Sequence, residues 1–157
     1  MSEEGRGDRW LFVRALLAFL ALPGVVAFAV PLLLLRPAGA RALTADGAVV
    51  LTIGVVVLCW CVRDFYVAGR GTLAPWSPPR HLVREGLYRV SRNPMYLGVL
   101  LVVLGWALGF RSRAVALYAA ALAVAFHLRV VRGEEPWLAR THGEAWEAYR
   151  RAVRRWL

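Results

Sequence analysis

Residues 93–128 read NPMYLGVLLVVLGWALGFRSRAVALYAAALAVAFHL, which is two apolar blocks joined by a short basic turn. The blocks, 93–110 and 114–128, are shorter than the roughly 20 residues that cross a hydrocarbon core of about 30 Å. Arginines at their ends can reach the interface and make up the difference. Because the connection Arg111–Arg113 is too short to hold a domain, we expect the blocks to form a tight helical hairpin in a membrane.

Two more apolar blocks precede the hairpin, at 15–35 and 47–62. The first contains Pro23 and Pro31, which membrane helices tolerate better than soluble ones do. The 157 residues are 59% hydrophobic with a mean hydropathy of +0.52, which excludes an ordinary soluble domain and a disordered chain. We therefore predict an all-α polytopic membrane protein with about four transmembrane helices.

The charge is carried by 20 arginines, with no lysine, against 10 acidic residues, which gives a net charge of +10. Four spans place both termini on one side of the membrane. That side would hold 16 arginines, in 1–14, 63–92 and 129–157, and the opposite side four. The positive-inside rule then predicts cytoplasmic termini, and the plasma membrane if the source is bacterial.

Several other functions are disfavoured by the composition. The arginines are divided among loops and the tail with no recognised reading module, so we expect no nucleic-acid partner. Cys59 and Cys61 lie inside an apolar block, which excludes a disulfide framework and a thiolate zinc site, and we expect no metal. No glycine-rich nucleotide motif follows a strand, so a soluble Rossmann-type enzyme is unsupported.

Two segments on the predicted cytoplasmic side are more than linkers. Residues 69–86 are rich in Gly and Pro and predict an irregular ordered loop. Residues 134–157 predict an amphipathic helix, or two helices broken near Gly143, which together with the loop would cap a site. A plain surface anchor is the alternative, with arginines on lipid phosphates. Its apolar stripe would be Trp137, Leu138, Trp146, Tyr149, Val153 and Trp156, and its basic residues Arg150, Arg151, Arg154 and Arg155.

Polar residues gather at both cytoplasmic ends of the hairpin. At its start, Asn93 suits an N-cap and Pro94 a first helical turn. A helix start with interfacial aromatics would explain that segment, but Tyr88, Arg92 and Tyr96 add polar groups that a simple span would not carry. At its end, Glu134 and Glu135 follow Arg129 and Arg132. These four residues could form a salt-bridge network or a cation site. Because both ends lie at the same height, we predict one joint site.

Residues 82–98, LVREGLYRVSRNPMYLG, together with EEPWL at 134–138, resemble the integral-membrane methyltransferases. This superfamily includes isoprenylcysteine carboxyl methyltransferase and phosphatidylethanolamine N-methyltransferase. The resemblance covers about 65–157. Asn93 stands where the prenylcysteine enzymes have His, as on the phospholipid side, while His142 and Trp146 replace a tail Phe and Tyr. The matching positions are Leu82, Val83, Gly86, Tyr88, Arg92, Asn93, Pro94, Tyr96, Gly98, Glu134, Glu135, Gly143 and Tyr149.

The resemblance implies a methyltransferase that uses S-adenosylmethionine and methylates a lipid or small hydrophobic acceptor at the cytoplasmic face. It implies a single integral-membrane domain over 1–157, with two spans in 1–64 and a catalytic core in 65–157. The implied catalytic residues are Glu135, Arg129 and Arg132. Either Arg129 or Arg132 would hold an anionic group of the acceptor. The implied cofactor-binding residues are Leu82, Val83, Tyr88, Asn93, Pro94, Met95, Tyr96 and Glu134.

Two other classes of protein fit part of the pattern. A non-catalytic membrane scaffold or lipid-binding anchor needs only the spans and the basic tail, and leaves the polar residues of the hairpin ends unexplained. A small four-helix exporter predicts short loops and a charge within a span. The loop of about 30 residues, the long tail and the lack of a mid-span acid disfavour it.

Overall fold

The computed structural model describes residues 20–36, 42–69 and 82–157, and most of the chain within these ranges is helical. No strand is present there apart from a single bridge between Ser91 and Arg154. The all-α prediction is confirmed for this part of the chain. The elements are η1 (Leu20–Ala29), α2 (Val30–Leu35), α3 (Ala45–Gly69), η3 (Gly86–Arg89), α4 (Pro94–Gly109), α5 (Arg113–Arg129), η4 (Val130–Glu134) and α6 (Glu135–Ala152).

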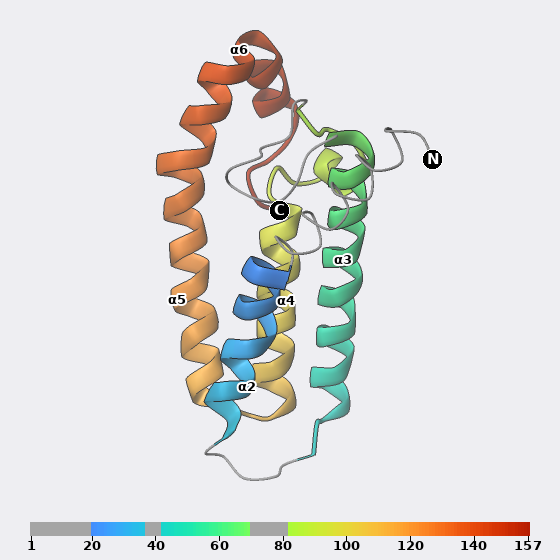
Figure 1. Ribbon diagram of the computed structural model, residues 1–157, viewed down its shortest axis with the longest axis vertical. Helices are drawn as coiled ribbons and strands as arrows, with labels where there is room; N and C mark the ends of the chain where they lie inside the picture. The colour runs from blue at the N-terminus through green and yellow to red at the C-terminus, as the bar shows by residue number, and fades with distance from the viewer. Residues whose placement is uncertain (1–19, 37–41, 70–81) are drawn as a thin grey trace, which may run out of the picture.

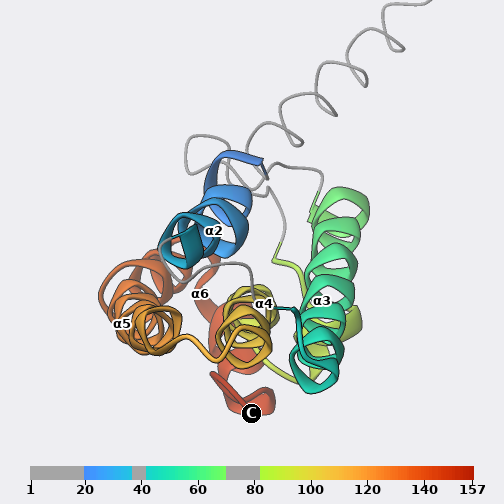
Figure 2. The same cartoon turned by 90° about the horizontal axis from the view of Figure 1, so that it is seen from below.

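The long helices run side by side along one axis, and α6 bends over one end of them (Figure 1). Helix α4 lies between α3 and α5, while η1 and α2 pack against α4 and α5 (Figure 2). Helices α4 and α5 form the hairpin that the sequence predicts. Its turn contains Arg111 at φ 49°, and the Ser112 hydroxyl caps α5 by accepting from Val115 N at 3.4 Å.

Two helical segments of the described chain are long and apolar enough to cross a membrane. They are Ala45–Asp64, and the continuous helix that begins at Arg113. The apolar helices Pro23–Leu35 and Pro94–Gly109 are shorter. Helix α3 continues to Gly69, beyond the predicted block 47–62. Residues 15–19 of the first block and 70–81 of the predicted loop lie outside the described residues.

Helices α3 and α4 approach closely because glycines face the neighbouring backbone. A Cβ at Gly54 would lie 2.5 Å from Val102 N, and one at Gly105 would lie 2.5 Å from Leu51 N. Small residues allow this approach, which is a common basis for helix packing where water supplies no hydrophobic driving force. The close packing of α3 and α4 fixes the end of the bundle where α3 ends and α4 begins, which is called the upper end below.

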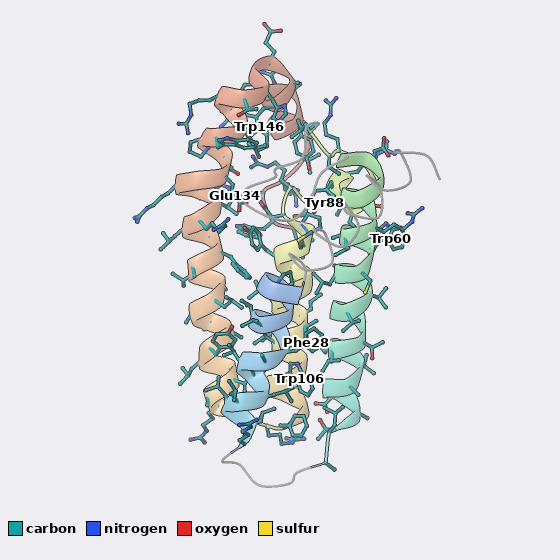
Figure 3. The ribbon with its side chains drawn as sticks, viewed as in Figure 1. Phe28, Trp60, Tyr88, Trp106, Glu134 and Trp146 are labelled. Atoms are coloured by element: carbon teal, nitrogen blue, oxygen red, sulfur yellow. The ribbon has the colours of Figure 1, made fainter. Side chains whose placement is uncertain are left out.

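Two backbone carbonyls in the turn before Pro31 accept side-chain hydrogen bonds in the middle of the bundle. Pro31 itself has no N–H to donate to that turn. Trp106 Nε1 donates to Ala27 O at 3.1 Å, and Tyr118 Oη donates to Val26 O at 3.0 Å. Phe28 and Trp106 also make an edge-to-face ring contact (Figure 3). Side chains of α4 and α5 therefore donate to two backbone carbonyls in the turn before the proline, and backbone groups inside a membrane require such partners.

Helix α6 is broken at Gly143, whose φ of 49° and ψ of −123° are outside the helical region. The alternative of two helices broken near this glycine is thus confirmed. After Ala152 the chain leaves the helix and returns toward the start of α4 (Figure 1). Residues 153–157, called the C-terminal strap below, were predicted to continue the amphipathic helix. That prediction is wrong, because Val153 is extended and Arg154 pairs with Ser91.

Candidate functional site

Three side chains from the two ends of the hairpin meet in what we call the Glu134 cluster: Tyr96, Arg129 and Glu134. Tyr96 Oη donates a hydrogen bond to Glu134 Oε1. Arg129 Nε donates to the same oxygen at 2.9 Å and to Tyr96 Oη at 3.1 Å. The predicted convergence of the two hairpin ends is therefore present. The Glu134 side chain remains 35% exposed, so it lies at an accessible edge.

The wide helical turn η4 brings Arg129 and Glu134 together. In an α-helix, five steps along the chain rotate the side chain by about 500°, so residues i and i+5 point about 140° apart. In a π-helix the hydrogen bond joins residues i and i+5, so residues five apart share a face. The π-helical residues Val130–Glu134 therefore allow the 2.9 Å contact between Arg129 and Glu134. Such wide turns occur frequently at functional sites.

The adjacent carboxylate belongs to a different group, the Glu135 cluster of Arg92, Glu135 and Arg155. Arg155 donates from Nε to Oε1 and from Nη2 to Oε2, both at 2.8 Å. Arg92 Nη1 lies 3.0 Å from Oε1, an ion pair without hydrogen-bond geometry. The side chains of Arg92 and Glu135 are only 8% and 13% exposed. This arrangement joins α4, α6 and the C-terminal strap.

The two arginines of this cluster stabilise the charge of Glu135. Burial disfavours the ionised form of Glu135, but the hydrogen bonds from Arg155 and the charge of Arg92 outweigh it and lower the pKa of Glu135. Burial lowers the pKa of Arg92 against the opposing effect of Glu135. The Arg92 guanidinium also lies 5.3 Å from the ring centroid of Trp146, a cation–π contact. Glu135 is thus held as a carboxylate by two guanidinium groups.

The C-terminal strap fastens the tail to the start of α4. Arg92 N donates to Arg154 O at 2.9 Å, and Asn93 Nδ2 donates to Arg155 O at 3.0 Å. Asn93 occupies the predicted N-cap position, but its side chain makes no cap hydrogen bond because its amide is used by the strap. Pro94 is the first residue of α4, as predicted. Trp156 Nε1 donates to His127 Nδ1 at 3.3 Å, which links the strap to α5.

Tyr88 is buried beside Cys61 and Val83 at the upper end of α3. Its carbonyl accepts a hydrogen bond from Tyr149 Oη at 2.7 Å. Burial, followed by the charges of neighbouring groups that include Asp64 and Glu134, raises the pKa of Tyr88 well above its usual value. Burial raises the pKa of Tyr149 to about 12. Both phenols are therefore neutral at physiological pH.

The remaining residues of the predicted site differ in their surroundings. Met95 packs against both the cluster around Tyr88 and the core of the bundle. Leu82 is partly buried and Val83 buried. Arg132 is exposed, and its side chain is not among those that the structure joins to either glutamate. Of the two candidate arginines, the structure therefore brings only Arg129 to the Glu134 cluster.

Sequence reasoning gave no role in the site to four residues that the structure places at this end of the bundle. Arg155 was interpreted as a lipid-facing charge, and Tyr149 as part of an apolar stripe. Ser91, whose Oγ accepts from Asn93 N and donates to Arg155 O, carried no motif. Asp64 is buried at the upper end of α3, although an acid directly after an apolar block is a signal that could have identified it.

The family of this protein is identified by its similarity to known sequences. The family model described as phospholipid methyltransferase matches residues 42–145. That range covers α3, α4, α5, both glutamates and Gly143. No curated protein and no solved structure gives a significant match. The chain belongs to the phospholipid methyltransferase family, and the resemblance to membrane methyltransferases is confirmed.

Proposed function

We propose that this protein transfers a methyl group from S-adenosylmethionine to a lipid or small hydrophobic acceptor at the cytoplasmic face of a membrane. The observation that carries the proposal is the Glu134 cluster, where the start of α4 and the end of α5 meet through Tyr96, Arg129 and Glu134. Family membership supports methyl transfer and a lipid-type acceptor. The donor, the acceptor and the membrane side are parts of the proposal.

For the topology we propose four spans with both termini cytoplasmic. The two long apolar segments have only 22% and 17% of their apolar windows buried, so most of that surface needs apolar surroundings. The hairpin turn carries Arg111 and Arg113, whereas the opposite end of the bundle carries both clusters and the strap. An arginine excess at that end supports a cytoplasmic orientation. We propose one domain over 1–157, with a catalytic core in 65–157.

The residues at this end suit the donor chemically. When bound, S-adenosylmethionine supplies a methyl group on a sulfonium, and the sulfur keeps the electron pair of the broken bond as a thioether. Glu134 is suited to accept from an ammonium or from ribose hydroxyls. Tyr88 and Tyr96 offer aromatic faces to an adenine or a cation. The amino end of α4, at Asn93–Tyr96, favours a carboxylate, with the backbone of Leu82–Val83 nearby in the chain.

The remaining charged residues receive different roles in this proposal. Arg129 pairs with Glu134 and faces an anionic group of the acceptor, and Arg132 is the second candidate for that contact. Glu135, which sequence reasoning proposed as catalytic, has both oxygens engaged by Arg155, so we assign it a positioning role. The acceptor lone pair forms the new bond to the methyl carbon. Alignment of the two reactants should supply most of the rate.

The first experiment incubates the purified protein with radiolabelled S-adenosylmethionine and total membrane lipid, and separates the labelled products by chromatography. We expect label in a lipid fraction, at a level that depends on protein concentration. Calorimetry with adenosylhomocysteine then compares the wild type with E134Q. Loss of one charge-assisted hydrogen bond is worth about 1.5–3 kcal/mol, so affinity should fall by about 10- to 150-fold.

E147Q is the matched control, because Glu147 pairs with Arg150 on the exposed face of α6, away from Tyr96. It should bind adenosylhomocysteine like the wild type. The proposal is overturned if the wild type neither binds adenosylhomocysteine nor labels any lipid. Equal affinity of E134Q and wild type would remove Glu134 from the donor site.

A further inference from the structure

Asp64, near the upper end of α3, is a buried carboxylate that the proposed chemistry has not used. The residue is 7% exposed, and its Oδ2 has no hydrogen-bond partner among the described residues. Its Oδ1 lies 3.5 Å from Nη1 of Arg63, whose side chain is 71% exposed. Such a long contact to a solvent-exposed arginine stabilises little. One oxygen of a buried charge is therefore left unsatisfied, which is costly unless something binds it.

Asp64 Oδ2 occupies the space that a side chain at Gly86 would need. A Cβ at this position would lie 2.0 Å from Asp64 Oδ2 and 3.2 Å from Trp60 Nε1. The φ of Gly86 is 55°, a conformation that other residues rarely adopt. Glycine therefore lets the backbone of 82–88 pass directly against the carboxylate. This backbone leads to Tyr88, so Asp64 borders the segment that we propose for the donor.

The buried ring of Tyr88 lies close enough to Asp64 and to Glu134 to be affected by the charges of both. The pKa of Tyr88 responds to both carboxylates, after burial and the effects of Cys61 and Tyr149. Glu134 is already paired with Arg129, whereas Oδ2 of Asp64 has no partner among the described residues, so the environment of Asp64 favours a cation. A neutral ligand would leave the charge of Asp64 uncompensated.

We propose that Asp64 Oδ2 binds a cationic nitrogen carrying N–H donors, an inference that rests on the proposed function. Two sources have this chemistry: the ammonium of the methyl donor and a protonated amine in the head group of a lipid acceptor. Either one satisfies the orphaned oxygen and compensates its charge. Each predicts a different pattern of binding for the isosteric variant Asp64→Asn.

The donor source is tested by calorimetry with adenosylhomocysteine and with methylthioadenosine, which lacks the amino-acid group. If Asp64 binds the donor ammonium, D64N lowers the affinity for adenosylhomocysteine by about 10- to 150-fold and leaves the affinity for methylthioadenosine unchanged. The acceptor source is tested with short-chain phosphatidylethanolamine and short-chain phosphatidylglycerol. If Asp64 binds the acceptor amine, D64N weakens only the amine lipid, by a similar factor.

D46N is the matched control, with the same substitution at the exposed, opposite end of α3. It should change none of the four affinities. The inference is overturned if D64N leaves all four unchanged, or if it weakens methylthioadenosine or phosphatidylglycerol as much as the amine-bearing probes. If the wild type binds adenosylhomocysteine while D64N has no selective effect, only the role of Asp64 fails. If the wild type binds no adenosylhomocysteine, the proposed function fails.

The ligand-free protein provides a second readout that does not depend on binding. Because Oδ2 has no partner, replacing the carboxylate with an amide should leave the Tm unchanged or raise it. A fall of several degrees would mean that the charge has a structural partner, and would overturn the inference. Far-UV circular dichroism confirms that the helices are retained in the variant.

Discussion

Glu134 and Glu135 are neighbours in the chain but belong to two different parts of the molecule. Glu134 is 35% exposed and bonded to Tyr96 and Arg129, at the end of a wide helical turn. Glu135 is 13% exposed and enclosed by Arg92 and Arg155. One residue along a helix turns the side chain by about 100°, so consecutive residues face different neighbours. Two identical neighbouring residues of a motif can therefore have different roles.

The division suggests how the site is built. The Glu135 cluster is saturated by guanidinium groups and joins three chain segments, which is the pattern of a structural element. The Glu134 cluster has partners on one oxygen and an accessible edge, which is the pattern of a ligand site. Variants of the two clusters should therefore differ in whether they change stability or ligand affinity.

Replacing Glu135 with Ala should destabilise the protein most. It leaves Arg92 buried without its counter-ion, and breaking such a pair costs about 3–5 kcal/mol. Equilibrium unfolding in mixed micelles measures the loss. The matching variant Glu134→Ala should cost less than 1 kcal/mol, because its partner Arg129 is 56% exposed. Equal losses in the two variants would contradict the proposed division.

Replacing Gly143 with Ala should destabilise the Glu135 side of the site and spare the Glu134 side. A Cβ there would meet nothing within 4 Å, so the cost comes from the backbone conformation alone, about 1–3 kcal/mol. The Tm should fall while affinity for adenosylhomocysteine stays within about threefold. Gly133→Ala is the control, since Gly133 also has open space but a helical conformation. It should leave the Tm unchanged or raise it.

Acid should selectively remove the contribution of Glu135. The folded-state pKa of Glu135 is lowered, so its stabilising effect is complete above the unfolded value of about 4.3 and is lost as pH falls through the folded value. The Tm difference between wild type and E135Q should therefore be constant from about pH 7 to 5 and shrink below about pH 4. A Tm difference that grows as the pH falls would contradict a lowered pKa of Glu135 in the folded state.

The smallest effect is expected for Tyr96→Phe. It removes the hydroxyl that donates to Glu134 but keeps the ring packed against Phe126, 4.4 Å between centroids. Calorimetry should show adenosylhomocysteine binding weakened by about 3- to 10-fold, with little change in Tm. Tyr118→Phe is the matched control, because Tyr118 Oη bonds Val26 O in the middle of the bundle. It should lower the Tm and leave affinity unchanged.

Much of the architecture followed from local patterns. Uninterrupted apolar blocks predicted the helices, Pro94 the start of α4, and Gly143 the break in α6. The equal height of the two hairpin ends predicted the meeting of Tyr96 with Glu134. These inferences succeeded because helix length and turn residues are decided by neighbouring residues.

Other features depended on contacts between distant segments. Nothing in the tail predicted that residues 153–157 would leave the helix, because the extended conformation is stabilised by Ser91, Arg92 and Asn93. The orphaned oxygen of Asp64 arises from the passage of Gly86 beside it, 22 positions further along the chain. Local propensity contains no information on such pairings.

The amino-acid sequence alone determined the helical class, the hairpin and the family motifs, because apolar blocks and proline or glycine act within short stretches of the chain. Only the tertiary structure decided which glutamate is enclosed and which faces an accessible edge. That choice depends on the wide turn at 130–134 and on the returning strap, and both are set by packing between segments that are far apart in the chain.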